Sequence, residues 1–289
     1  MDANVVIVHA IFHRLRQLSH DQSEPTLHTL GSFRRAHRRA YYALLTRLER
    51  RIYSNPGVAL AAVSARTAVQ LNSYFHRDDV RVIPNGVDSV QFSPSNRLSR
   101  RPEARLRRKL QPDDFVLLLI GNDWDVKGLA TVIRAMAIVP DLPLQLIVVG
   151  SDAPLPFEQL SKQLGVSSRC RWEQPSGDVL DCYAAADLYV SPTREDSFGL
   201  PVAEAMASGL PVITSTFAGV SALVQDGIDA FVLGDPLDAP TLAKLLQLLH
   251  GQPELRARMG NAAAQTALAW TWDHNAASVW QLLKSLKAT

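Results

Sequence analysis

A strand, a loop, a helix and a second strand follow one another near residue 200, and this order constrains the fold more than any other feature. Residues 188–190 are apolar and favour a strand, Pro201 stands where the first turn of a helix tolerates proline, and Gly209 ends that helix before the apolar residues 211–213. Such βαβ units build parallel sheets. We therefore expect an α/β fold whose ligands bind in the loop between the first strand and the helix.

This loop and its helix carry the groups expected of a phosphate and sugar site. A helix that begins at Pro201 directs backbone N–H groups and the positive end of its dipole toward the loop, where an anion such as phosphate is stabilised. The carboxylates of Asp196 and Glu204 would repel phosphate but accept hydrogen bonds from hydroxyl groups. One can bind the diol of a ribose and the other the hydroxyls of a hexose. The sequence therefore predicts one crevice for nucleotide, phosphate and sugar.

The spacing of the two carboxylates resembles a motif of the retaining GT-B glycosyltransferases of group 1, in which seven residues separate two glutamates. Asp196 takes the place of the first glutamate and Glu204 that of the second. The resemblance implies that Glu204 binds the nucleotide ribose and that Asp196, which is one methylene shorter than glutamate, contacts the donor sugar. It implies a further group of donor-binding residues at the start of the helix: Ser197, Phe198, Gly199, Leu200, Pro201 and Val202.

Two more segments resemble the same family, in the same order. Residues 115–128, FVLLLIGNDWDVKG, resemble its strand, glycine turn and Lys-Gly element, which binds the donor diphosphate. Gly121 matches the glycine and Lys127 the lysine, while Asn122 stands where arginine is commoner. Residues 80–93, VRVIPNGVDSVQFS, resemble the link between the two domains of the family. The resemblance thus covers most of the chain.

The order of elements and the resemblance together predict a GT-B-like fold, with two Rossmann-like, doubly wound α/β domains. Alternating strand and helix patterns fill residues 112–271, the expected donor-binding domain. Residues 1–95 are expected to form a partial N-terminal domain on the acceptor side, and residues 96–111 a basic, mobile linker. Residues 272–289 are expected to form a helix that crosses back to the N-terminal domain.

The N-terminal part is shorter than the resemblance requires. Its first strand, residues 4–8, matches a later strand of the family, so the glycine-rich strand turn that precedes it there is missing. Loss of a central strand exposes sheet edges and apolar surface. We expect either another chain that completes the sheet or a truncated or shortened form of the family. His9 follows this strand, where the family carries a histidine near the donor sugar, and both a site role and an ordinary surface role stay open for it.

Charge is divided unevenly, although the formal net charge is only +2. Residues 1–111 hold 19 Lys and Arg against 8 Asp and Glu, whereas residues 112–289 hold 11 against 20. Much of the positive charge lies in residues 31–54, which fit an amphipathic helix. Its apolar side would carry Phe33, Tyr41, Leu44, Leu45, Leu48 and Ile52.

Three interpretations of this basic helix are open. It can be a core helix with a solvated face, a docking surface for anionic lipid, or a nucleic-acid surface. The aromatic residues lie on the apolar side rather than between the arginines, which weakens a stacking platform for bases. No nucleic-acid partner is therefore expected, and an anionic membrane surface stays a candidate partner.

Cysteine usage and hydropathy add two expectations. Cys170 and Cys182 lack the spacing of a metal site and suggest a reduced, cytoplasmic setting. The sequence shows neither a signal-peptide pattern nor an apolar run of membrane-spanning length, so any membrane contact would be peripheral, at the inner face.

The resemblance implies an enzyme that transfers a sugar from a nucleotide diphospho-sugar to the hydroxyl of a saccharide or lipid-linked acceptor, with retention of configuration. It implies no metal and no cofactor. Lys127, Asp196 and His9 would take part in catalysis. The alternative is a catalytically impaired nucleotide-sugar-binding or interaction protein derived from the same family, and a related epimerase or phosphorylase is less favoured.

Overall fold

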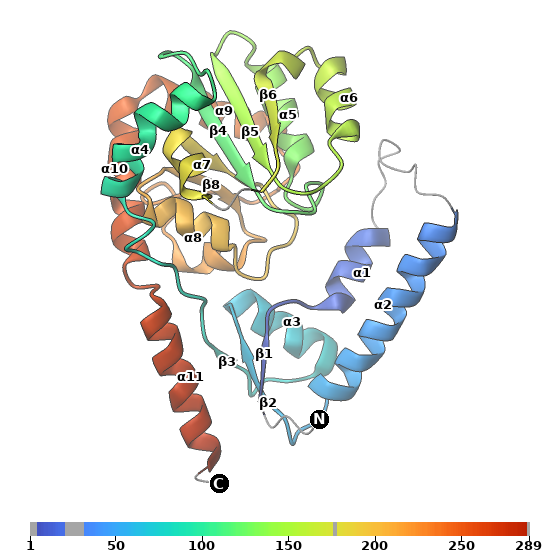
Figure 1. Cartoon of the computed structure of the whole chain (residues 1–289). Helices are drawn as coiled ribbons and strands as arrows, with labels where there is room; N and C mark the ends of the chain where they lie inside the picture. The colour runs from blue at the N-terminus through green and yellow to red at the C-terminus, as the bar shows by residue number, and fades with distance from the viewer. Residues whose placement is uncertain (1–4, 21–31, 176–177, 288–289) are drawn as a thin grey trace. The chain divides into compact units, whose positions relative to one another are not determined.

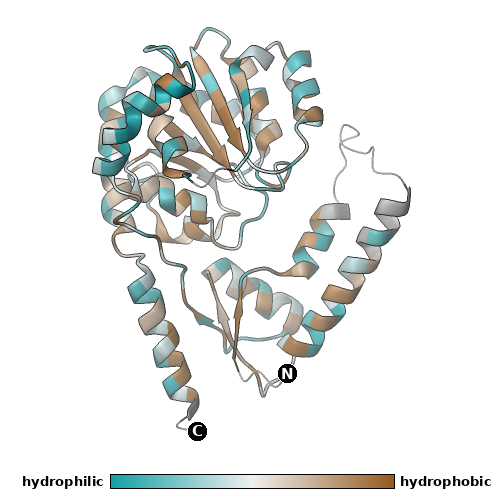
Figure 2. Ribbon diagram, in the orientation of Figure 1, coloured by the Kyte–Doolittle hydropathy of each residue, from teal (hydrophilic) through white to brown (hydrophobic). Residues whose placement is uncertain are grey.

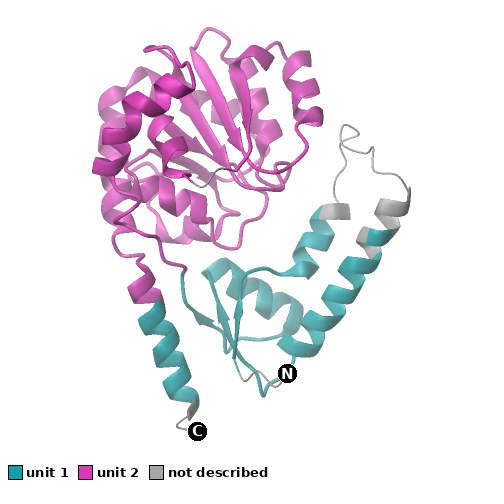
Figure 3. Cartoon of the chain, viewed as in Figure 1, with its two compact units in different colours: residues 1–84, 276–289 teal, residues 85–275 magenta. Residues whose placement is uncertain are grey.

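The computed structural model describes residues 5–20, 32–175 and 178–287. The chain divides into two compact units, which are coloured separately in Figure 3. Unit 1 comprises residues 1–84 and 276–289, and unit 2 comprises residues 85–275. The first unit thus ends at residue 84, whereas the sequence predicted a boundary at residue 95.

Unit 2 is built on a six-stranded sheet in which every pair of neighbours is parallel. Its order is β6-β5-β4-β7-β8-β9. The strands are β4 (Phe115–Ile120), β5 (Leu144–Val149), β6 (Cys170–Glu173), β7 (Leu188–Val190), β8 (Val212–Ser215) and β9 (Phe231–Leu233). The apolar runs of β4 and β5, brown in Figure 2, are those of a sheet covered on both faces. The predicted doubly wound α/β domain is confirmed.

Helices between and after the strands of unit 2 cover its sheet (Figure 1). They are α5 (Leu129–Ile138), α6 (Leu155–Gln163), α7 (Leu180–Ala185), α8 (Leu200–Ala207), α9 (Ala239–Gly251) and α10 (Pro253–Ala267), with short 3-10 turns at Ser167–Arg169 and Gly219–Leu223. α5 packs on α9, and α8 packs on α10. Each buries a largely apolar stripe, which is what fixes it to the sheet.

The segment expected to be a mobile linker is instead a helix of unit 2. Residues 94–107 form α4 (Pro94–Arg107), which packs on α7. Arg101 and Arg105 both pair with Asp187, at 2.5 and 3.2 Å. Just beyond the helix, Arg108 pairs with Glu173 at 2.9 Å and with Asp181 at 2.8 Å. The basic run is therefore ordered by acidic residues far away in the sequence. Its own composition does not reveal these partners, so it suggested a solvated segment.

Unit 1 is a small three-stranded parallel sheet with helices. The strands β1 (Val5–Val8), β2 (Ala59–Ala62) and β3 (Arg81–Val82) lie in that order, so β2 is central. Its helices are α1 (Phe12–His20), α2 (Ser32–Tyr53), α3 (Ala65–Phe75) and the part of α11 (Trp272–Lys287) from residue 276 onward. The N-terminal unit is thus an α/β unit with a small parallel sheet, as expected.

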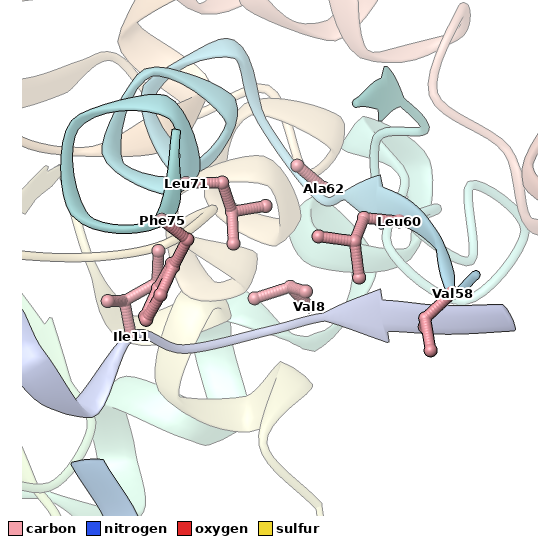
Figure 4. Packing of buried hydrophobic residues seen from close by; sticks show 7 residues of the cluster. All are labelled: Val8, Ile11, Val58, Leu60, Ala62, Leu71 and Phe75. Atoms are coloured by element: carbon pink, nitrogen blue, oxygen red, sulfur yellow. The ribbon is translucent and has the colours of Figure 1, made fainter. Parts of the chain in front are cut away.

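Two clusters hold unit 1 together. Figure 4 shows the first, in which side chains of β1, β2, α3 and the residues next to the two strands meet: Val8, Ile11, Val58, Leu60, Ala62, Leu71 and Phe75. In the second, Leu282 of α11 packs against Ala61 and Ile83. The last helix thus contributes a buried side chain to unit 1.

The basic helix α2 packs in an unexpected way. Its deeply buried side chains are polar: Thr46 donates to the carbonyl of Tyr42 at 2.8 Å, and Glu49 accepts hydrogen bonds from the start of α1. The apolar side chains of the predicted stripe are instead exposed, by 40–59%: Tyr41, Leu44, Leu48 and Ile52. Leu45 is half-buried, and the side chain of Phe33 lies outside the described part of the chain. The apolar stripe is therefore not the side that packs within unit 1.

Candidate active site

The predicted site residues of unit 2 gather at the carboxyl ends of β4 and β7. These two strands are neighbours in the middle of the sheet, with β5 and β6 on one side and β8 and β9 on the other. The chain order of the strands reverses between them, and open α/β sheets bind ligands at such a switch point. The residues predicted for the site therefore lie at the switch point of this sheet.

Two loops that follow these strands are bonded to each other. The hydroxyl of Thr193 and the backbone N–H of Arg194 both donate to the carbonyl of Val126, at 3.0 and 2.7 Å. Gly128 makes this approach possible, because it has φ +79° and a Cβ there would lie 2.1 Å from the carbonyl oxygen of Pro192. The glycine after Lys127 is thus required by the packing of the loops.

Trp124 anchors the first of these loops. Its indole is 1% exposed and lies against Trp172 and Phe157, with ring centroids 5.6 and 5.9 Å away. Its backbone N–H donates to Asp152 at 2.7 Å. Because a buried aromatic ring holds this loop, the backbone that carries Lys127 has a fixed position.

Lys127 and Asp196 form the central contact of the site. The ammonium nitrogen of Lys127 lies 2.5 Å from Oδ2 of Asp196, and both side chains are about five-sixths buried, with 15% and 16% exposed. Asp196 is itself fixed, since its backbone donates to Phe217 at 3.0 Å and accepts from Gly219 at 2.8 Å. The structure thus brings together one residue from each predicted donor motif, 69 positions apart in the sequence.

Gly121 provides the space for the lysine stem. It has φ +137°, and a Cβ built on it would lie 3.1 Å from Cε of Lys127. Any larger residue would be strained by the backbone and would push the ammonium group away from Asp196. Gly121, the glycine of the predicted diphosphate element, therefore leaves the space that the Lys127 side chain needs.

Helix α8 begins at the same loop. Its N-cap is Gly199, with φ +97°, and no side chain caps this end of the helix. Pro201 occupies the first turn, while the backbone N–H groups of Val202 and Ala203 return to the carbonyl of Gly199. Phe198 is buried and its N–H donates to Asp196 at 3.3 Å. The uncapped positive end of α8 thus adjoins the loop of Asp196, where it can stabilise an anionic ligand.

Glu204 lies one turn into α8 and is held by a residue that the sequence did not point to. The hydroxyl of Tyr183 donates to Oε2 of Glu204 at 2.6 Å. Burial raises the pKa of Glu204, and the hydrogen bond from Tyr183 lowers it. The signal for Tyr183 was weak, since a tyrosine in the apolar stretch 180–186 is an ordinary core residue.

Two other predicted residues have different surroundings. Asn122 is exposed, and its side-chain oxygen accepts from the backbone of Ser151 at 2.9 Å, so it links the loops after β4 and β5. His9 belongs to unit 1, where it is exposed just after β1. Nearby His13 bonds through Nδ1 to the carboxylate of Glu49 at 2.7 Å, a contact that accounts for it structurally.

In the described residues no group of three or more His, Cys, Asp or Glu side chains is placed to hold a metal ion.

Two α/β units, the second with a lysine, an uncapped helix and two carboxylates at its switch point, define a GT-B-like protein. The sequence matches the family "Glycosyl transferases group 1" over residues 101–266, and "Glycosyltransferase Family 4" over residues 7–91. This chain belongs to the group 1 glycosyltransferases. The predicted family is confirmed at that level.

Individual relatives agree with this assignment. The chain is 33% identical to a D-inositol 3-phosphate glycosyltransferase of Thermomonospora curvata over 232 residues, which are 75% of this chain and 53% of that protein. A protein of the same name from Nocardia farcinica is 31% identical, over 76% of this chain and 50% of the relative. The chain thus spans about half the length of these relatives.

Solved structures show the same fold. WaaG, a glycosyltransferase involved in lipopolysaccharide biosynthesis, superposes with a TM-score of 0.76 at 24% identity, over 91% of this chain and 70% of WaaG. HepE of Anabaena in complex with UDP-glucose gives a TM-score of 0.77 at 20% identity, over 97% of this chain and 72% of HepE. At these identities the likeness establishes the architecture.

Proposed function

We propose that this chain transfers a sugar from a nucleotide diphospho-sugar to an acceptor hydroxyl, with retention of configuration. The contact between Lys127 and Asp196 carries the proposal, because it joins the expected diphosphate-binding residue to the expected sugar-binding residue. Glu204, on the helix that begins beside this contact, is proposed to accept hydrogen bonds from the ribose hydroxyls. HepE, a protein of the same fold, binds UDP-glucose, which makes UDP-sugars the first donors to test.

The ion pair removes the difficulty of a carboxylate beside a diphosphate. An ammonium group has three N–H donors, so Lys127 can bond to Asp196 through one and still bind phosphate oxygens through the others. Its positive charge offsets the carboxylate, whose second oxygen can accept from sugar hydroxyls. The pair thus suits a ligand that carries a phosphate next to a sugar.

The chemistry follows from these contacts. The bond between the anomeric carbon and the phosphate oxygen breaks, the acceptor oxygen bonds to the anomeric carbon on the same face, and the hydroxyl proton passes to the departing phosphate. Negative charge grows on the diphosphate, where Lys127 and the start of α8 stabilise it. Asp196 orients the sugar. His9 is proposed as a further sugar contact.

A transfer assay tests this function. The purified chain is incubated with UDP-, GDP- and ADP-glucose and with D-inositol 3-phosphate, the acceptor in the names of its relatives. Release of the nucleoside diphosphate and formation of an α-linked product are expected with one donor. Tight binding of a donor without hydrolysis or transfer would contradict the proposal and favour the catalytically impaired binding protein, a function that the small sheet of unit 1 makes a real alternative.

We further propose that α2 docks unit 1 on an anionic membrane. Its exposed apolar side chains Tyr41, Leu44, Leu48 and Ile52 are spaced to lie on one side of the helix, and Arg47 and Arg51 are exposed beside them. None of the described helices is long and apolar enough to cross a bilayer. We propose a peripheral contact, made by a cytoplasmic protein at the inner membrane face.

Vesicle sedimentation measures this contact. The double variant Leu44→Ser and Leu48→Ser is expected to lower binding to phosphatidylcholine vesicles containing phosphatidylglycerol by at least about tenfold, since each leucine loses its burial in lipid. The matched control carries Leu98→Ser and Leu106→Ser, which replace exposed leucines of the other basic helix, α4. Equal binding of wild type to vesicles with and without phosphatidylglycerol, or equal loss in both double variants, would contradict the docking.

A further inference from the structure

Tyr183 connects helix α7 to the carboxylate of the candidate site. Its side chain is fully buried, and its hydroxyl lies 2.6 Å from Oε2 of Glu204 and 3.2 Å from the carbonyl oxygen of Pro201. One phenol therefore contacts both the first turn of α8 and the residue expected to bind ribose. None of the family's motifs in this sequence includes Tyr183.

The ring of Tyr183 has little freedom to move. Phe92 packs against it edge-on, with centroids 5.7 Å apart, and Tyr189 lies 6.3 Å away on the sheet. Its helix, α7, is held to the segment around α4 by Asp181, which pairs with Arg107 and Arg108 at 2.5 and 2.8 Å. Because the Tyr183 hydroxyl is fixed in this way, its hydrogen bond favours one orientation of the Glu204 side chain.

We propose that Tyr183 is a positioning residue that holds Glu204 in the orientation and charge state required to bind the ribose of the donor. This inference rests on the proposed function. The phenol occupies one carboxylate oxygen, which leaves Oε1 for the ribose hydroxyls. Without the hydrogen bond from Tyr183, the buried carboxylate of Glu204 would turn between rotamers. Its ionised form would also lose part of its stabilisation.

The hydrogen bond from Tyr183 also affects the pH at which Glu204 loses its charge. Two phenols lie near Glu204, but only Tyr183 of α7 donates a hydrogen bond to it, whereas Tyr189 of β7 does not. Burial raises the pKa of both phenols, so both stay neutral in the range in which a carboxyl group titrates. The pair formed by Lys127 and Asp196 lies in the same site. Loss of the Tyr183 hydrogen bond leaves burial unopposed and raises the pKa of Glu204 further. Nucleotide binding should then begin to weaken at a higher pH as the solution is acidified.

The experiment compares Tyr183→Phe with Tyr189→Phe in the full chain. Both changes delete one buried hydroxyl, but that of Tyr189 lies 3.4 Å from the carbonyl of Ile120 and does not bond to Glu204. Titration with UDP, GDP and ADP identifies the nucleotide that wild type binds. Its Kd is then measured from acid to neutral pH for each variant, together with thermal unfolding.

Tyr183→Phe is expected to raise Kd about three- to tenfold at neutral pH and to move the acid midpoint of binding upward. Tyr189→Phe should leave both unchanged. In the double variant with Glu204→Gln, removal of the Tyr183 hydroxyl should have no additional effect, because the carboxylate on which it acts is gone. Additive losses, or an unshifted midpoint in Tyr183→Phe, would overturn the inference while the proposed function stands. Wild type that binds none of the nucleotides would overturn both.

Discussion

Replacing Lys127 with alanine is expected to lower kcat/KM for the nucleotide sugar about 100- to 1,000-fold. The diphosphate gains negative charge as the sugar leaves, and a mostly buried ammonium group stabilises that charge more strongly than water can. The change also leaves Asp196 with no ammonium partner beside the ligand. Most of the loss should appear in kcat, because the charge is largest in the transition state.

Controls separate this effect from a general loss of stability. Lys244→Ala removes an exposed lysine from α9 and should retain wild-type activity. Lys127→Arg keeps the charge, but a wider guanidinium group must fit where the lysine side chain is mostly buried against Asp196. Activity between those of wild type and the alanine variant is expected. A Lys127→Ala protein with wild-type kcat/KM would remove Lys127 from the site.

The sequence was most informative where one element decides the structure by itself. The apolar strands 115–120 and 144–149, the proline in the first turn of α8 and Gly209 are local signals, and the parallel sheet and its switch point follow from them. The carboxylate spacing then placed Asp196 and Glu204 at that point. For these residues, local pattern and tertiary structure agree.

Tertiary contacts decided the features that the sequence did not predict. The run 94–107 is a helix because its arginines meet Asp187 and Asp181, about 80 residues away along the chain. A hydrophobic stripe indicates that α2 is a helix but does not specify which side packs, and in unit 1 the polar side with Glu49 packs. Tyr183 is similar, because its role depends on a partner in another helix.

Replacing Glu204 with glutamine is expected to weaken binding of the nucleotide by roughly 1 to 3 kcal/mol, about 5- to 150-fold in Kd. The substitution preserves shape but exchanges a charged acceptor for a neutral amide, so the charge-assisted hydrogen bonds to the ribose diol are lost. Calorimetric titration with UDP, or with whichever nucleoside diphosphate binds wild type, measures the change. Glu254→Gln, an exposed position in the first turn of α10, is the matched control and should leave Kd unchanged.

The pH dependence of the same titration identifies the group responsible. Burial raises the pKa of Glu204, so its carboxylate is lost at a higher pH than that of an exposed glutamate. Wild-type affinity should therefore be full above that pKa and fall as the pH is lowered through it. Glutamine does not titrate, so Glu204→Gln should bind weakly at both ends of the range, without this step. A variant that keeps the wild-type affinity and the wild-type acid limb would show that the ribose is bound elsewhere.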